Sequence, residues 1–215
     1  MTSEELTPRV LSAMPIFPLP DCVLLPGGLL PLHVFEQRYR ELTRDCLAGP
    51  RLMAIARLRA GYETDYHGRP PVHSHIGIGR VIDSEEQDDG RYLLVLGGVA
   101  RADIVDELPP RRSYREVRAR LLRDTATHAG TLHDCRDQLV AICDHIAQLV
   151  EGGEALRELV RSGEPGECAD AVAAAIVRDV DERQRLLECQ CPQTRIDRTL
   201  ELAGALLGRL SPYSN

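Results

Sequence analysis

The feature of this sequence that most constrains its fold is a change in the spacing of its apolar residues near residue 123. Before that point, short stretches alternate between apolar and polar residues or are continuously apolar, as β-strands are, at residues 52–58, 76–82, 91–99 and 114–121. After it, apolar residues recur every three or four positions, which is the spacing of one helix face. We therefore predict an α+β fold, with a β-rich part at 10–123 and a helical part at 124–215.

One helix and one tight turn are expected among the strands. The helix should begin after Pro31 and end at about Leu47, because Gly49 and Pro50 stop it. The segment Asp88–Gly90 separates two apolar stretches, which is typical of a β-hairpin.

The helical part offers several side chains that could cap helix N-termini. Thr131 and Asp181 each precede an apolar stripe of helical spacing, and Thr194 with Asp197 has the spacing of a capping box. We predict three helix starts at these positions.

Charge divides along the same boundary. Residues 1–123 hold 17 Arg and 17 acidic residues, whereas residues 124–215 hold 9 Arg and 16 acidic residues. The whole net charge of −7 therefore belongs to the helical part. This balance does not favour a nucleic-acid partner, because such proteins usually contain a basic domain.

The chain contains no lysine, since all 26 of its basic residues are arginines. A P-loop needs a lysine to reach the phosphates, and a Ser-Lys dyad or a Schiff base needs a lysine amine. No serine has the Gly-x-Ser-x-Gly setting of a nucleophile elbow. We therefore expect no catalytic residues, no cofactor and no enzymatic activity from this chain.

Several sequence blocks resemble the N-terminal substrate-binding domain of Lon, the ATP-dependent protease La. Their order and spacing carry the resemblance, and they lie at Met14–Leu32, Val34–Arg40, Ile76–Val81, Gly90–Tyr92, Gly97–Arg101, Arg183–Glu188 and Arg195–Arg198. The resemblance implies a PUA-like β-barrel with an inserted helix, followed by an α-helical bundle. It also implies capture of polypeptides, while separate domains of full Lon proteases supply ATPase and peptidase activity.

From the resemblance we expect a free-standing, non-catalytic module that binds polypeptides or another protein. Its partners would be unfolded or degron-bearing chains, and its role that of an adaptor in proteolysis or protein quality control. The absence of a signal peptide or a long apolar segment predicts a cytoplasmic protein without a membrane partner. The seven cysteines are expected to be free thiols.

The candidate peptide-binding residues form two groups. Four leucines flank a Pro-Gly-Gly turn, and they form either an exposed apolar patch or part of the core: Leu24, Leu25, Leu29 and Leu30. The second group, Glu36, Arg38 and Tyr39, opens the predicted helix. It forms either a polar recognition patch or a structural lock between helix and barrel.

A row of arginines between Arg111 and Arg123 supports an alternative function. PUA-like barrels elsewhere bind RNA, and Arg115, Arg118 and Arg120 could contact phosphates. The other interpretation is that this row pairs with the acidic helical part.

Histidines and cysteines raise the question of a zinc site. His67, His73 and His75 lie close together in the sequence, and Cys189 and Cys191 form a second pair. Neither group has a partner pair at the spacing of zinc ligands, so we predict no metal site.

Overall fold

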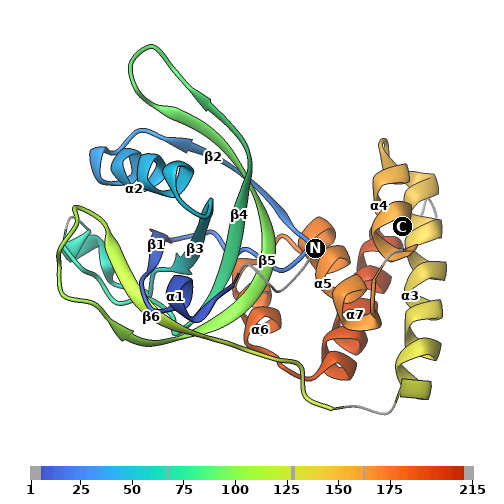
Figure 1. Cartoon of the computed structure of the whole chain (residues 1–215). Coiled ribbons are helices and arrows are strands. Elements are labelled where there is room, and N and C mark those ends of the chain that lie inside the picture. Colours follow the sequence, from blue (N-terminus) through green and yellow to red (C-terminus); the bar gives the residue numbers. More distant parts are fainter. Residues whose placement is uncertain (1–5, 67, 127–128, 162, 211–215) are drawn as a thin grey trace. The chain divides into compact units, whose positions relative to one another are not determined.

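The computed structural model describes residues 6–66, 68–126, 129–161 and 163–210. The chain forms two compact units, Met1–Leu122 and Arg123–Asn215. A six-stranded sheet lies in the first unit and five helices form the described part of the second (Figure 1). The predicted α+β class is confirmed.

The strands of the first unit are ordered β2-β5-β4-β3-β1-β6, and a further pairing between β5 and β6 closes the sheet into a barrel. Strand β2 stays outside this ring, because it pairs with β5 at the end of the order. The elements are α1 (Pro8–Leu11), β1 (Met14–Leu19), β2 (Leu29–Val34), α2 (Gln37–Ala48), β3 (Leu52–Arg57), the 3₁₀ helix η2 (Tyr62–Asp65), β4 (His75–Glu86), β5 (Tyr92–Glu107) and β6 (Arg115–Leu121).

Strand β3 shows why one of the predicted strands is continuously apolar. Its residues Leu52, Ala54 and Ala56 belong to one buried cluster, with Ile16 of β1. The alternate residues Met53 and Ile55 belong to a second cluster, which contains Tyr39 and Leu42 of α2. Because successive strand residues point to opposite faces, β3 is buried on both faces.

The helix α2 begins later than the sequence predicts. Leu32 to Val34 belong to β2, where they pair with Leu94, Leu93 and Tyr92 of β5. Pro31 is compatible with this strand because β2 lies at the edge of the sheet. The prediction of a helix starting directly after Pro31 was therefore wrong, and the first helical residue is Gln37.

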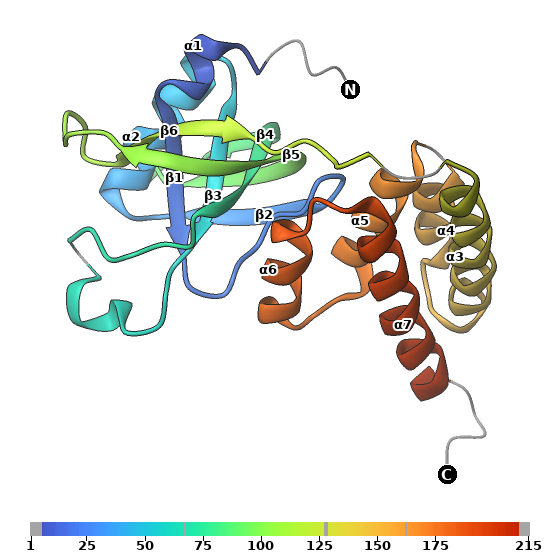
Figure 2. The ribbon, with the colours of Figure 1, turned by 90° about the horizontal axis from the view of Figure 1, so that it is seen from below.

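The second unit consists of α3 (Ala129–Leu149), α4 (Gly153–Arg161), α5 (Pro165–Ile176), α6 (Val180–Glu188) and α7 (Pro192–Leu210). Helix α7 packs against α3 and α5 (Figure 2). Leu139, Val172 and Ile196 contribute one side chain each from these helices to the core.

The predicted helix caps were wrong in position. Thr131, Asp181 and Thr194 lie inside α3, α6 and α7, which begin two, one and two residues earlier respectively. The side chain that caps α6 is Asp179, which accepts a hydrogen bond from the Glu182 amide at 2.8 Å. A one-turn error of this kind arises because several acceptors near a helix start have similar capping ability.

Within the described residues, no helix combines the length and the apolar character that a membrane span requires.

Candidate functional site

The turn that carries the four candidate leucines lies directly against the barrel. Leu24 and Leu25 are buried, with 2% and 1% of their surfaces exposed. A Cβ atom at Gly77 would overlap the carbonyl oxygen of Leu24, and one at Gly98 would overlap that of Leu25. The two glycines therefore allow this close approach, and Leu24 and Leu25 are core residues rather than an exposed patch.

Leu29 has the opposite environment, since 69% of its surface is exposed. The register pairs Leu29, Pro31 and His33 of β2 with Gly97, Val95 and Leu93 of β5. Residues that alternate along a strand share one face, so these six residues lie on the same side of the sheet. The intervening Leu30 and Leu32 pack against the core on the other side.

Strand β4 extends this face on the other side of β5. Asp83 pairs with Val95, and Glu85 pairs with Leu93. Ile82, which is 49% exposed, lies above Gly97, because a Cβ on that glycine would be 3.3 Å from the Ile82 Cγ2 atom. The His33 and Phe35 rings lie 5.9 Å apart at the far end.

These contacts define one surface, which we call the outer face. Its apolar residues are exposed or partly exposed, and two exposed carboxylates line it; it consists of Leu29, Pro31, His33, Phe35, Ile82, Leu93, Val95, Asp83 and Glu85. It contains a groove of about 490 Å³ between β2 and β4. Natural monomers rarely expose large contiguous apolar surface without a binding role.

Of this surface, only Leu29 was among the predicted site residues. Phe35, Ile82 and Leu93 were not identified, and the continuously apolar Tyr92–Leu96 segment predicts a strand without indicating which of its faces is exposed. A signal was present in Asp83 and Glu85, two carboxylates two residues apart, which are typical of the exposed face of a strand.

The second candidate group forms a structural lock. The Tyr66 hydroxyl donates to Glu36 Oε1 at 2.7 Å, and the Arg38 Nε donates to Glu36 Oε2 at 3.0 Å. The Arg38 guanidinium lies over the rings of Tyr39 and Tyr66, at 4.7 and 5.3 Å from their centroids. These contacts join the start of α2 to the segment after η2.

Tyr39 extends the same lock into the core. Its ring stacks on Phe17 of β1, with 4.0 Å between the centroids. Burial raises the pKa of the Tyr39 phenol, so the group stays protonated at all physiological pH values. The structural interpretation of Glu36, Arg38 and Tyr39 therefore agrees with their contacts.

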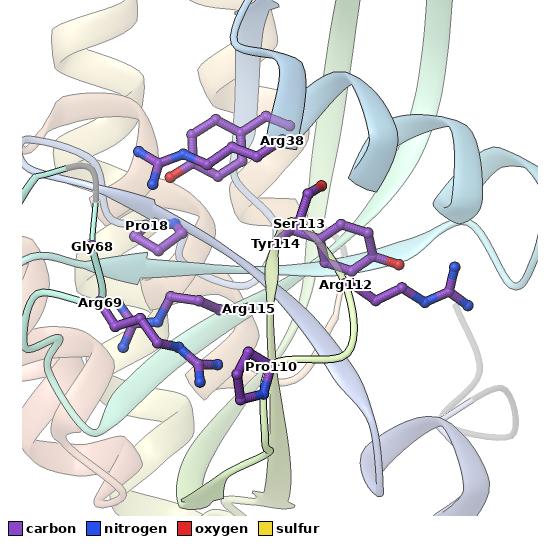
Figure 3. A pocket seen from close by; sticks show the side chains of 10 residues that line it. Pro18, Arg38, Gly68, Arg69, Pro110, Arg112, Ser113, Tyr114 and Arg115 are labelled. Atoms are coloured by element: carbon purple, nitrogen blue, oxygen red, sulfur yellow. The ribbon is translucent and has the colours of Figure 1, made fainter.

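A small pocket opens beside this lock. Its volume is about 210 Å³, and the residues that line it come from β1, α2, two loops and β6: Pro18, Arg38, Tyr39, Gly68, Arg69, Pro110, Arg112, Ser113, Tyr114 and Arg115 (Figure 3). In the view of Figure 3, Arg38 lies above Pro18, whereas Arg69 and Arg115 lie below it.

The arginine row pairs with carboxylates of its own unit. Arg115 Nε lies 2.7 Å from Glu107, Arg118 Nη1 lies 3.2 Å from Asp106, and Arg120 Nη2 lies 2.8 Å from Asp103. All three carboxylates belong to β5. These pairs neutralise most of the positive charge that phosphate binding would need, and they account for the row without the acidic helical part.

The described residues contain no group of three side chains that could hold a metal ion. His75 lies 3.2 Å from Asp103, and the predicted candidate His67 lies outside the described residues. All seven cysteines lie within the described ranges and are free thiols. Burial raises the pKa of Cys46 and of Cys143 to about 12, so neither is a reactive thiolate.

A β-barrel covered by one helix, an exposed apolar strand face and a helical bundle together define a barrel-and-bundle domain. The family model of the ATP-dependent protease La (LON) substrate-binding domain matches residues 13–203. The chain belongs to this family, and the predicted resemblance is confirmed.

Relatives and solved structures agree with this assignment. The chain is 29% identical over 205 residues to Lon protease 2 of Myxococcus xanthus, covering 94% of this chain and 24% of that protein. It is also 29% identical over 209 residues to the Lon protease of Anaeromyxobacter dehalogenans, with the same two shares. The chain thus spans about a quarter of the length of these relatives, and the matched part contains no protease domain.

Two solved structures share the fold. The N-terminal domain of a Mycobacterium avium complex Lon protease has a TM-score of 0.66 at 16% identity, covering 90% of this chain and 98% of that chain. A Lon N-terminal domain protein from Xanthomonas campestris has a TM-score of 0.59 at 20% identity, covering 88% and 98%.

Proposed function

We propose that this chain is a non-catalytic module that binds unfolded or degron-bearing polypeptides, as an adaptor in proteolysis or protein quality control. The observation that carries the proposal is the outer face, an exposed apolar surface on three neighbouring strands of a substrate-binding domain. Leu29, Ile82 and Leu93 expose 69%, 49% and 41% of their surfaces there. Burying a leucine side chain contributes about 1.5–3 kcal/mol, so covering these three residues with an apolar ligand would favour binding.

The ligand that fits this surface is an extended segment with apolar side chains and flanking basic residues. The groove is lined by β2, β5 and β4, and an extended chain can place alternate side chains in it. Asp83 and Glu85 line it, and their charge favours Arg or Lys beside the apolar residues of the ligand. Folded proteins rarely display such segments, whereas unfolded chains do.

Fluorescence anisotropy with labelled peptides tests this proposal. The Leu93→Ser variant should bind an apolar, basic-flanked peptide roughly tenfold more weakly, because it removes one buried contact. Val105→Ser is the matched control, since Val105 also belongs to β5 and is 56% exposed but does not lie on the outer face. Equal binding by both variants and the unmodified chain would exclude the outer face as the binding surface.

The non-catalytic part of the proposal is supported by the missing lysines. Without one, the chain cannot supply the phosphate-binding lysine of an ATPase or the base of a Ser-Lys dyad. We place the module in the cytoplasm, where its free cysteines would stay reduced.

RNA binding by Arg115, Arg118 and Arg120 stays a weaker alternative, because each side chain has a carboxylate partner on β5. Retention of RNA that depends on salt, and that disappears in an Arg118→Ala/Arg120→Ala double variant, would favour it over the peptide proposal.

A further inference from the structure

The pocket beside the lock has an unequal charge distribution. Four of the ten residues that line it are arginines, and none is acidic. The carboxylates that pair with these arginines, Glu36, Asp45 and Glu107, are not among the lining residues. The pocket is therefore bordered by arginines and by no carboxylate, although the Arg112 guanidinium points away from Pro18 and the other three arginines in Figure 3.

Arg115, one of the four arginines that line the pocket, is held in a fixed orientation. Arg115 donates from Nε and Nη2 to the two oxygens of Glu107, at 2.7 and 2.8 Å, and from Nη1 to the Pro70 carbonyl at 2.7 Å. This fork and its burial leave it one geometry.

Arg69 is held less completely than Arg115. Its contacts with the described residues go through Nη2, which lies 2.8 Å from Glu107 Oε1 and donates to the Leu108 carbonyl at 3.1 Å. The guanidinium has further N–H groups on Nε and Nη1. Arg69 can thus add a ligand without losing its present partners.

The size and the walls of the pocket limit what it can accept. At about 210 Å³ it is smaller than the cavities that hold cofactors or drug-sized molecules, which are about 300–1,000 Å³. Pro18, Tyr39 and Pro110 provide apolar surface beside the guanidinium groups. Such a pocket fits a short group with one anionic end and an apolar body.

We propose that this pocket binds the C-terminal carboxylate and last side chain of a captured polypeptide. A carboxylate is the planar anion that guanidinium groups recognise through paired hydrogen bonds. The position fits as well, because Phe35 ends the outer face and Arg38, at the pocket, follows three residues later. This inference rests on the proposed function, and it makes the module selective for chain ends.

The test compares two versions of one apolar, basic-flanked peptide, one with a free C-terminal carboxylate and one with a carboxamide. Anisotropy titrations are made with the full chain, with Arg69→Gln and with Arg118→Gln. Arg118 is the matched control, because it is also a barrel arginine paired with a β5 carboxylate but does not line the pocket. Circular dichroism checks that each variant is folded.

The full chain and Arg118→Gln should bind the carboxylate peptide about tenfold more tightly than the carboxamide, as expected for hydrogen bonds to a charged group. In Arg69→Gln this preference should fall to about threefold or less. In an NMR titration, the Arg69 Nε–H signal should shift with the carboxylate peptide alone.

Equal binding of both peptides by the full chain would overturn the proposed carboxylate site. The proposed function would still hold if Leu93→Ser bound both peptides more weakly. The carboxylate site would also be overturned if Arg69→Gln kept the full preference and the Arg69 Nε–H signal of the unmodified chain did not shift. If neither peptide bound, both the proposed function and the proposed carboxylate site would be overturned.

Discussion

An exposed pair of arginines in the barrel and a buried arginine in the helical unit make a useful comparison. In the barrel, Arg118 and Arg120 lie on the surface, 56% and 72% exposed, and pair with carboxylates across neighbouring strands. In the helical unit, Arg195 is 1% exposed and pairs with Asp124 and Asp170, at 2.8 and 3.1 Å. The acidic helical part, residues 124–215 with net charge −7, thus contains a buried cation.

This difference shows that net charge does not indicate where ion pairs stabilise a fold. Exposed pairs contribute little, because water already solvates both partners. Arg195, by contrast, donates from Nη1 and Nη2 to both oxygens of Asp124 and from Nη1 to the Cys189 carbonyl at 3.0 Å. It therefore joins the segment before α3 and the end of α6 to α7.

The largest expected effect is that of Arg195→Leu. It removes the guanidinium from beside the carboxylate of Asp170, which is 4% exposed, and breaking a buried pair in this way costs about 3–5 kcal/mol. Hydrogen–deuterium exchange should accelerate in α5 and α7. In an Arg195→Leu/Asp170→Leu double variant much of the loss should be recovered, since no buried charge is left. A double variant less stable than the single one would contradict this account.

The next effect concerns close backbone packing in the barrel. Gly77→Ala places a Cβ against the Leu24 carbonyl, and neither strand nor turn can shift freely. Overpacking of this kind costs about 1–3 kcal/mol, so exchange should accelerate in β4 and in residues 23–28. Gly97→Ala is the control, because its Cβ would meet the flexible Ile82 side chain at 3.3 Å. Equal losses of stability in both variants would show that the cost does not come from the close approach of Gly77 to the Leu24 carbonyl.

The sequence predicted the strands and helices better than it predicted the site. Alternation and helical spacing depend on which face is buried, so β3, β6 and the helices of the second part follow from local patterns. The exposure of Leu29 and the burial of Leu24, five residues earlier, do not follow from local patterns. They depend on the pairing of β2 with β5 and on the glycines of β4 and β5, which are distant in sequence.

The arginine pocket could not be predicted from local sequence patterns either. Arg38 and Arg115 were each identified, but for different roles, and Arg69 was not identified at all. Closure of the barrel brings β1, α2 and β6 to one place, and only this closure shows that their arginines share a pocket. The predicted capping positions were wrong for a simpler reason, because several side chains within one turn can act as the capping acceptor.

A smaller effect is expected from acid in the helical unit. Hydrogen bonds from Arg198, with further ones from Arg185, lower the pKa of Glu182 in the folded state. Its stabilising contribution is therefore complete above the unfolded-state pKa of about 4.3 and is lost as the pH falls through the lower folded-state value. Glu182→Gln should reduce stability at pH 6 by about 1 kcal/mol and flatten the pH dependence below pH 4.5.

Thermal melting followed by circular dichroism at several pH values measures this effect. Glu201→Gln is the control, because Glu201 also pairs with Arg198 but is 65% exposed. A Glu182→Gln variant with the same acid sensitivity as the unmodified chain would show that other carboxylates control it.

The smallest effect should come from Arg118→Ala, and it completes the contrast with Arg195. Its partner Asp106 is 45% exposed and stays hydrated when the guanidinium is removed. Exposed pairs contribute about 0–1 kcal/mol, so denaturant unfolding should change by less than about 0.5 kcal/mol. High salt should leave this small difference smaller still, because ions screen exposed charges. A loss comparable to that of Arg195→Leu would mean that an exposed pair stabilises the fold as much as a buried one, and the contrast between Arg118 and Arg195 would fail.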